Sequence, residues 1–269
     1  MSDAAPQTLA LRAEGPVLHV TLNRPARRNA MSAAMVAELS DVLASVAVGE
    51  TRVLVLRGAG GHFCAGGDIS DMAEAAGAQA AGGDPVAAFN RTFGTLLQAA
   101  EACPAAVVAV CEGAVMGGGF GLACVADVTI AVDGARFRLP ETSLGISPAQ
   151  IAPFIVRRVG LSHARRLAVT GQTLGAQDAV DLQLAHHFAP SAEAADGLLS
   201  QTLSSILRCE PHAVAETKRL MLATSATQLD AVLDDAARGF SVLARSERAQ
   251  AGFTAFLTRQ PAPWVPSES

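Results

Sequence analysis

Two short, uniformly apolar segments, each followed closely by a glycine-rich turn, constrain the fold of this chain most. Residues 53–56 and 106–111 lack the polar alternation of a half-exposed strand, so we expect strands that are buried on both faces of a sheet. The turns read HFCAGGDI, residues 62–69, and EGAVMGGGFGLA, residues 112–123. Glycine in such a turn lets a ligand or a second backbone segment approach closely. Each turn taken alone is also explained as tight packing against its strand.

The rest of the chain predicts more strands and then a helical region. Ser32 is the expected N-cap of an amphipathic helix, and another helix is expected over residues 86–102, after an Ala- and Gly-rich mobile loop at 77–84. Beyond Pro148 nearly every segment has a helical pattern, which indicates an α/β core with a C-terminal helical region. We expect a core at 1–195, the helical region at 196–260, a tail at 261–269, and further strands at 9–13, 17–22, 128–131 and 137–139.

Composition narrows the classes of function. The chain of 269 residues has a net charge of −5, so no global basic field attracts nucleic acid or an anionic membrane. No uninterrupted apolar run approaches the ~20 residues of a membrane-spanning helix, and residues 1–8 do not resemble a secretory signal. The five cysteines form no Cys-x-x-Cys pair, which is typical of reduced, buried thiols. We therefore expect a cytoplasmic protein.

Backbone amides and one carboxylate are the strongest candidates for chemistry. Gly117, Gly118 and Gly119 stand where a helix is expected to begin, and N–H groups at that place are free to bind an anion. Neither a dinucleotide fingerprint nor a P-loop pattern is present there. Glu141 lies in an otherwise uncharged segment, LPETSLGISP, where apolar surroundings would raise the pKa of its carboxyl and suit it to proton transfer. A turn-stabilising role for this glutamate is the simpler alternative.

Other polar residues have plainer explanations. His186 and His187 are adjacent, so they cannot both face one metal from one helix face, and we expect them at the surface or at a helix end. The pair Arg157-Arg158 is expected on a solvated helix face. No H-E-x-x-H, G-x-S-x-G or Cys/His metal pattern occurs, so the sequence predicts no metal site.

Five motifs in a fixed order together resemble the crotonase, or enoyl-CoA hydratase/isomerase, superfamily. They are VTLNRPARRNAM at 20–31, VLRGAGGHFCAGGDI at 55–69, VVAVCEGAVMGGGFGLACVADVTIA at 107–131, FRLPETSLGISP at 137–148 and RRLAVTGQTLGAQDAVDLQL at 165–184. The resemblance implies an α/β spiral of ββα units followed by helices that cover the active site or assemble the subunits, as a homotrimer or a dimer of trimers. It also implies an acyl-CoA substrate, with no separate cofactor because CoA is part of that substrate.

The resemblance also implies a site. The backbone N–H groups of Gly67 and Gly118 would form an oxyanion hole for the thioester oxygen, with Glu141 as the acid/base. Residues that would contact the substrate or its CoA are Arg27, Arg28, Ala65, Gly66, Asp68, Ile69, Gly117 and Gln150.

One departure from the family limits the mechanism. Hydratases with two catalytic glutamates carry one of them where this chain has Gly121, so Glu141 alone would serve, either adding water to a 2-enoyl-CoA or moving a double bond as an isomerase. The segments GGGFGLA, PETSLG and PAQIAPF resemble the branch that handles branched or carboxylated glutaconyl-CoA, such as isohexenylglutaconyl-CoA and methylglutaconyl-CoA hydratases. A non-catalytic module that binds RNA or another partner is the remaining alternative.

Overall fold

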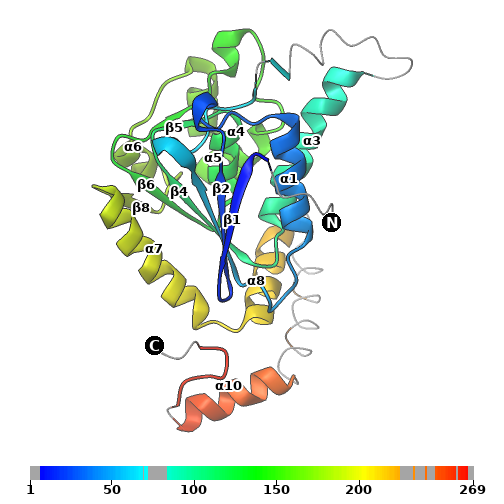
Figure 1. Ribbon diagram of the computed structural model, residues 1–269, viewed down its shortest axis with the longest axis vertical. Helices are drawn as coiled ribbons and strands as arrows, with labels where there is room; N and C mark the ends of the chain where they lie inside the picture. Colours follow the sequence, from blue (N-terminus) through cyan, green and yellow to red (C-terminus); the bar gives the residue numbers. More distant parts are fainter. Residues whose placement is uncertain are drawn as a thin grey trace.

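A computed structural model gives the fold of residues 7–68, 70–71, 84–224, 233, 240, 246–258 and 260–265. The loop expected at 77–84 lies outside these residues except for Asp84. Within them, strands and helices alternate along the first part of the chain and helices dominate the last part (Figure 1). The expected α/β core followed by helices is therefore confirmed.

The core is a six-stranded sheet with the strand order β1-β2-β3-β4-β6-β8. The first two strands are antiparallel, and every later neighbour in this sheet is parallel. A separate parallel pair, β5 and β7, stands beyond the carboxyl ends of β4 and β6. The strands are β1 Leu9–Glu14, β2 Val17–Leu22, β3 Val53–Gly58, β4 Ala106–Cys111, β5 Ala114–Met116, β6 Val128–Val132, β7 Arg136–Arg138 and β8 His187–Ala189.

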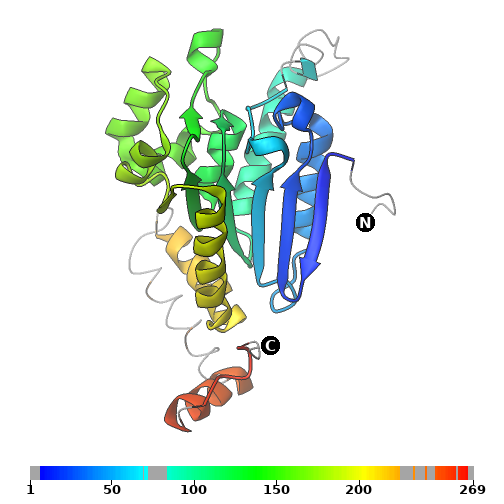
Figure 2. The same cartoon turned by 60° about the vertical axis from the view of Figure 1, so that its left-hand side comes forward.

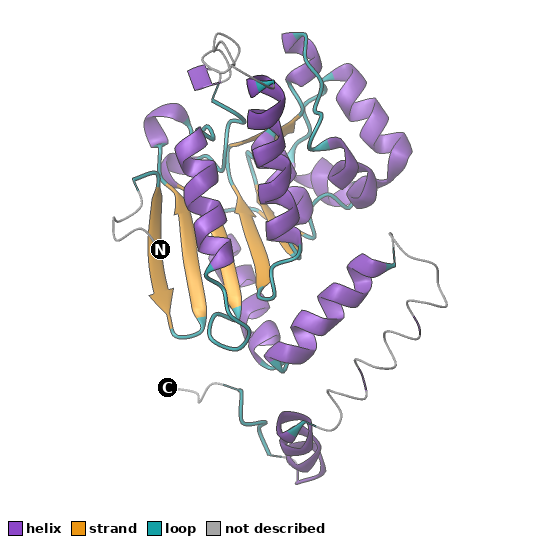
Figure 3. Cartoon of the chain, turned by 90° about the vertical axis from the view of Figure 1, so that its right-hand side faces the viewer, coloured by secondary structure: helices purple, strands orange, loops and turns teal. Residues whose placement is uncertain are grey.

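Helices cover both faces of this sheet. The α-helices are α1 Ala33–Ala44, α3 Pro85–Glu101, α4 Gly118–Val125, α5 Ala152–Thr170, α6 Ala176–Asp181, α7 Ala192–Leu207, α8 Pro211–Ala223 and α10 Glu247–Thr258. Short 3-10 helices are η1 Pro25–Arg27, η2 Ala59–Gly61 and η3 Glu141–Leu144. Figure 3 shows helices across one face of the strands, and Figure 2 shows α7 crossing the other.

Strand β4 shows why a uniformly apolar segment indicates a strand that is buried on both faces of a sheet. Its side chains alternate between two apolar cores, with Val107 and Ala109 facing the core beneath α1, α3 and α4. Val108 and Val110 face the core beneath α7. Because both faces are covered, every residue of this strand is buried, which confirms the prediction for β4 and, through the same alternation, for β3.

Two helices that border the site begin at side-chain caps. Ser32 accepts a hydrogen bond from the Met35 N–H at 3.2 Å, as expected from the sequence. Asp84 caps α3 in the same way, accepting from the N–H groups of Val86 and Ala87 at 3.0 Å each. These caps fix where α1 and α3 start, and both helices then pack against one another.

The second half of the chain corrects three expectations. Within the segment after Pro148, where only helices were expected, His187–Ala189 instead forms a strand, β8, which pairs in parallel with β6. The boundary expected between residues 195 and 196 falls inside α7, which packs onto the sheet and so belongs to the core. Four cysteines are buried and free as expected, but Cys209 is exposed. A three-residue strand is too short to show a periodicity, which explains why β8 was missed.

The end of the described chain is anchored to the core by Arg52. Its guanidinium donates to the carbonyl oxygens of Leu207, Cys209 and Trp264 at 2.8, 2.7 and 2.6 Å. Helix α10 nevertheless extends away from the sheet, as Figure 1 shows. None of the helices in the described part of the chain is both long enough and apolar enough to cross a membrane.

Candidate active site

The first glycine turn joins the end of β3 to Met31 at the start of α1. Met31 forms a parallel bridge with Gly67, in which the Met31 N–H donates to the Gly66 oxygen and the Asp68 N–H donates to the Met31 oxygen, both at 2.8 Å. In such a bridge the central residue, here Gly67, directs its own N–H away from the partner. Among the described residues, the Gly67 N–H has no hydrogen-bond acceptor.

The second glycine turn leads from β5 into α4. Gly117 precedes the helix with φ 47° and ψ −112°, a conformation that strongly favours glycine, and its N–H donates to the Arg138 oxygen at 3.1 Å. Gly118 is the first helical residue, so its N–H has no intrahelical partner. No acceptor for it is found within the described part of the chain.

The two turns touch each other. A Cβ placed on Gly117 would lie 3.4 Å from the Gly66 Cα, and one placed on Gly66 would lie 3.4 Å from the Met116 oxygen. A parallel bridge between Cys64 and Val115 holds the turns in this register. Gly67 and Gly118 each directly follow a residue of this contact, so their two unpaired N–H groups lie at the same junction.

Both glycines line one cavity of about 540 Å³, together with Glu141 and Gln150. The structure therefore brings together all three predicted catalytic residues and one predicted substrate-binding residue. Apolar side chains from Met31, α1, α3 and the segment after η3 make up most of the remaining wall: Met31, Val36, Val86, Phe89, Phe93, Ile146 and Ile151. A site of this kind excludes water from most of a bound apolar chain.

Glu141 is the first residue of η3 and directs its carboxyl group toward the second glycine turn. Its Oε1 lies 2.9 Å from the position of a Cβ on Gly117. Its Oε2 is buried and accepts no hydrogen bond from any described residue. Burial raises the pKa of this carboxyl, and only a hydrogen bond from its own backbone opposes the shift. A carboxyl group with a raised pKa and one oxygen free of partners is suited to accepting and returning a proton.

The position of the missing second glutamate is filled by apolar packing. Gly121 is buried in α4, and a Cβ placed on it would meet Leu97 Cδ1 at 3.1 Å and Ile151 Cγ2 at 3.4 Å. Gly121 is not part of the cavity wall. The other acidic residue in the wall is Asp84, whose carboxylate is engaged in capping α3. Glu141 is therefore the only described carboxyl in this wall without a structural role.

Gln150 reaches the cavity because α3 has a glycine opposite it. A Cβ placed on Gly94 would lie only 2.0 Å from the Gln150 Oε1. The side chains of Asn90 and Thr92 add further polar groups from α3 to the same wall. Sequence reasoning found Gln150 but missed these α3 residues, because their helical spacing marks only a helix and not which wall it forms.

Of the residues expected to contact the substrate or its CoA, the described ones other than Gln150 lie outside the cavity wall. Arg27 and Arg28 are exposed, and Ala65 donates its N–H to the Arg28 oxygen at 3.0 Å. Gly66 and Gly117 form the contact between the turns, and Ile69 lies outside the described residues. Their role in binding CoA stays a prediction.

Asp68 has a structural partner instead. Its carboxylate is buried and paired with Arg24 at 2.8 Å. Burial raises the pKa of this carboxyl, but the hydrogen bonds from Arg24 and Ser70 outweigh that effect and hold the pKa below its ordinary value. The side chain is therefore already satisfied, and any contact with CoA would be made by the Asp68 backbone.

Asn29 is a residue that sequence reasoning missed. It is fully buried, with a left-handed φ of 57°, and its Oδ1 accepts from the Arg24 N–H at 2.9 Å. Its Nδ2 donates to the oxygens of Ala59 and His62 at 2.9 and 2.6 Å. The side chain thereby ties the segment before α1 to the loop that leads into the first glycine turn.

No group of three or more His, Cys, Asp or Glu residues in the described ranges is arranged to hold a metal ion.

Comparisons with known proteins agree with this geometry. The family model described as enoyl-CoA hydratase/isomerase matches residues 12–266. The chain is 33% identical over 246 residues to 2,3-dehydroadipyl-CoA hydratase of Escherichia coli (strain K12), covering 91% of this chain and 93% of that protein.

Two solved structures match at a TM-score of 0.93 each: AtuE of Pseudomonas aeruginosa, 52% identical, and an enoyl-CoA hydratase/isomerase from Marinobacter aquaeolei, 46% identical. Both matches cover 97% of this chain and 100% of the other chain. The expected crotonase-type fold is thereby confirmed.

Proposed function

The chain belongs to the enoyl-CoA hydratase/isomerase family, and from that premise we propose that it adds water to a 2-enoyl-CoA thioester. The observation that carries this proposal is the meeting of two N–H groups without acceptors among the described residues, from Gly67 and Gly118, with the partnerless Oε2 of Glu141 at a single cavity. Membership of an enzyme family sets aside the alternative of a non-catalytic RNA-binding module.

The proposed reaction uses the two N–H groups to stabilise an enolate. Water attacks C3 of the enoyl chain as the Glu141 carboxylate takes one of its protons. The electrons of the C2=C3 bond move toward the thioester carbonyl, whose oxygen becomes negatively charged between Gly67 and Gly118. Preorganised donors at such a position contribute roughly 3 kcal/mol each to the transition state.

A single carboxyl can complete this cycle. The protonated Glu141 returns its proton to C2, the enolate collapses to the thioester, and the product carries the hydroxyl group on C3. The proposed reaction uses no metal, because the two N–H groups take the charge that a metal would otherwise stabilise. It uses no redox cofactor, because no electrons are exchanged, and CoA is part of the substrate. The raised pKa of Glu141 supports both halves of the transfer.

For the acyl group we propose a branched or carboxylated chain of the glutaconyl type. Phe89 and Phe93 give the cavity of about 540 Å³ an apolar wall for a branched chain, and Gln150 supplies an amide donor for a terminal carboxylate. The E. coli relative is named for 2,3-dehydroadipyl-CoA, a thioester whose acyl chain also ends in a carboxylate.

We also propose that the chain acts in the cytoplasm as a homotrimer or a dimer of trimers, the assemblies that the family resemblance implies. Exposed apolar side chains on α5 and α10, including Leu161, Val169 and Leu257, offer surface for contacts between subunits. Light scattering coupled to size exclusion measures the mass, and a monomer at micromolar concentration would contradict this part of the proposal.

Isomerisation is the second candidate, because one carboxyl group between C2 and C4 would also shift a double bond. Incubating the enzyme separately with a 2-enoyl-CoA and a 3-enoyl-CoA distinguishes the two, with mass spectrometry of the products in ¹⁸O-labelled water. Hydration adds one labelled oxygen to the 2-enoyl substrate. A product that has moved its double bond and gained no oxygen would reject the hydratase in favour of the isomerase.

A further inference from the structure

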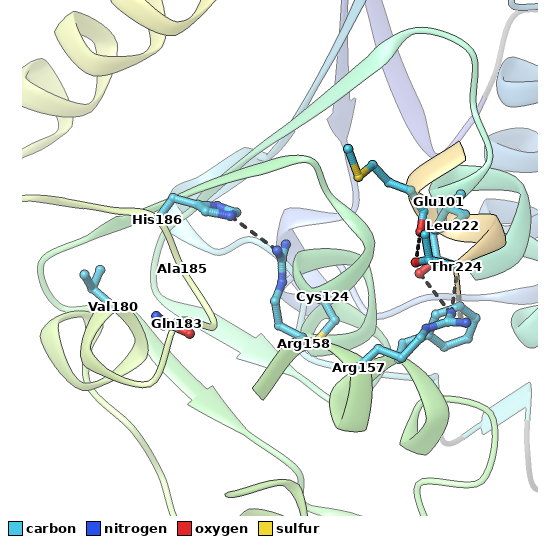
Figure 4. Close-up of a pocket in the computed structure, with 12 residues that line it drawn as sticks. Glu101, Cys124, Arg157, Arg158, Val180, Gln183, Ala185, His186, Leu222 and Thr224 are labelled. Atoms are coloured by element: carbon cyan, nitrogen blue, oxygen red, sulfur yellow. Dashed lines mark hydrogen bonds and ion pairs between the residues drawn. The ribbon is translucent and has the colours of Figure 1, made fainter. Parts of the chain in front are cut away.

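A second cavity, of about 730 Å³, shares no lining residue with the first. Its walls come from the ends of α3 and α4, from α5 and α8, and from the segment that leads into β8 (Figure 4). Helix α4 connects the two cavities, since Gly118 at its start lines the first and Cys124 near its end lines the second. The proposed hydration uses no group from this second site.

Arg158 extends along one wall of this cavity, contrary to the expectation of a solvated helix face. Its Nη2 donates to the carbonyl oxygens of Ala123 and Ala126, at 3.2 and 2.5 Å, near the end of α4. Its Nε is buried without an acceptor among the described residues. No carboxylate within the described ranges forms an ion pair with this guanidinium. Asp127 and Glu101 are near enough to act on the charge of Arg158, but neither forms an ion pair with it.

His186 faces the same guanidinium with a proton and not with a lone pair. Its Nδ1 accepts a hydrogen bond from the Thr129 N–H at 2.9 Å, so that nitrogen carries no proton. Burial and the charge of Arg158 lower the pKa of His186 to about 4, so the ring is neutral near pH 7 and its one proton is on Nε2. This Nε2 lies 3.3 Å from the Arg158 Nη1 (Figure 4).

Two donors that face each other at this distance repel unless both point at a common acceptor. The Arg158 Nη1 and the His186 Nε2 form such a pair, and neither has another acceptor among the described residues. An oxygen atom placed beside the pair could accept from both at once. Because one of the donors is charged, a negatively charged oxygen is favoured over a neutral one.

The charged side chains around Arg158 and His186 carry one more positive charge than negative charges. Arg157 is paired with both carboxylate oxygens of Glu101, at 2.9 and 2.7 Å, and Lys218 is paired with Asp127 at 2.6 Å. Among the described cations around this cavity, Arg158 is the one without an ion-pair partner. Phe154 and Met221 add apolar surface to the same cavity, which suits an anion with an organic body.

We propose that this second cavity binds a small oxyanion, a carboxylate or a phosphate, whose oxygen accepts hydrogen bonds from both Arg158 Nη1 and His186 Nε2. The ligand is held by the guanidinium charge and oriented by the imidazole. The remainder of an organic anion lies against Phe154 and Met221.

The experiment titrates the purified enzyme with sodium phosphate and, separately, with sodium acetate, replacing sodium chloride at constant ionic strength. Calorimetry measures the affinity, and the ¹⁵N-resolved signal of the His186 Nε2–H reports the place of binding. We expect saturable binding of at least one anion with a shift of that signal. The tighter of the two anions identifies whether a phosphate or a carboxylate is the natural source.

The discriminating variant is His186→Asn. The Asn Oδ1 can still accept from the Thr129 N–H, so the fold is retained, but no donor remains at the position of Nε2. Losing one hydrogen bond to a charged group weakens binding by about tenfold or more. His187→Asn is the matched control, because His187 is the adjacent residue and does not line the cavity.

Three results would overturn the proposal. The first is the absence of saturable binding of either anion to the wild-type protein. The second is an equal affinity in wild type and His186→Asn, or an equal loss in both histidine variants. The third is a smaller oligomeric mass in His186→Asn than in the wild type when no anion is added, which would assign the acceptor to a carboxylate of a second copy of the chain.

Discussion

Glu141 Oε1 lies 2.9 Å from the place where any side chain on Gly117 would begin. The acid/base proposed for the reaction is thus in contact with the backbone of the turn that supplies one of the two N–H groups. The contact depends on the absence of a side chain at residue 117, and it places the carboxyl group beside the oxyanion hole.

The first prediction follows from this contact. Gly117→Ala would combine a strained backbone, at φ 47° and ψ −112°, with a Cβ that collides with Glu141. We expect the free energy of unfolding to fall by about 1–3 kcal/mol from the strain alone, with kcat falling as the carboxyl group is displaced. Gly134→Ala is the control, because Gly134 also has a positive φ, of 83°, but open space around it. Equal kcat values in the two variants would contradict the role of the contact.

Glu141→Gln tests the carboxyl group itself. We expect kcat for hydration to fall at least about 10²-fold, because general acid–base catalysis contributes at least that much. KM should change little, since the amide has the same shape. In the wild type, kcat/KM should fall on the acid side with an apparent pKa above the ordinary value of 4.5, and this limb should be absent from any residual activity of the variant. Glu50→Gln, at an exposed position, is expected to behave as wild type.

The same variant predicts a pH dependence of stability with a defined sign. Because burial raises the pKa of Glu141, the folded protein holds this proton at pH values where the unfolded chain has lost it. Stability of the wild type relative to Glu141→Gln should therefore decrease as pH rises from 4.5 through the folded-state pKa. Denaturant unfolding of both proteins at pH values from about 4 to about 8 measures the difference between their free energies of unfolding. If the wild type instead became more stable relative to Glu141→Gln as pH rises, the fold would stabilise the carboxylate, and the prediction would be wrong.

Restoring the family's second glutamate should fail. Gly121→Glu would drive a side chain into Leu97 and Ile151, and overpacking of this kind costs about 1–3 kcal/mol before any cost of burying the charge. We expect a lower Tm and no gain in kcat. In the double variant with Glu141→Gln, the new carboxyl should not rescue hydration. Rescue would show that residue 121 can reach the substrate.

Gln150 and Gly94 should act together on specificity. Gln150→Leu removes the amide donor, and Gly94→Ala displaces the same amide, whose Oε1 lies 2.0 Å from the new Cβ. Both changes should lower kcat/KM for a substrate with a terminal carboxylate by about tenfold, the value of one hydrogen bond to a charged group. With crotonyl-CoA, which has no such group, both variants should match the wild type. A loss with both substrates would indicate a general defect of the cavity.

How much of the site could be predicted from sequence is clearest for the glycine turns. Gly118 could be placed at the start of a helix from the glycine triplet alone, since N–H groups at a helix start lack partners in any fold. The free N–H of Gly67 could not be derived in this way and came from the family resemblance. It arises from a bridge with Met31, which is distant in the sequence.

The sequence by itself determined the buried strands, the Ser32 cap of α1 and the presence of one carboxyl group in an apolar segment, because periodicity, side-chain size and local hydrogen bonding are properties of neighbouring residues. Only the tertiary structure decided that Phe93 of α3 lines the cavity of Glu141, that Leu97 fills the place of a second acid, and that His186 meets Arg158 donor to donor. These relationships depend on the register in which distant segments pack, and no local pattern encodes that register.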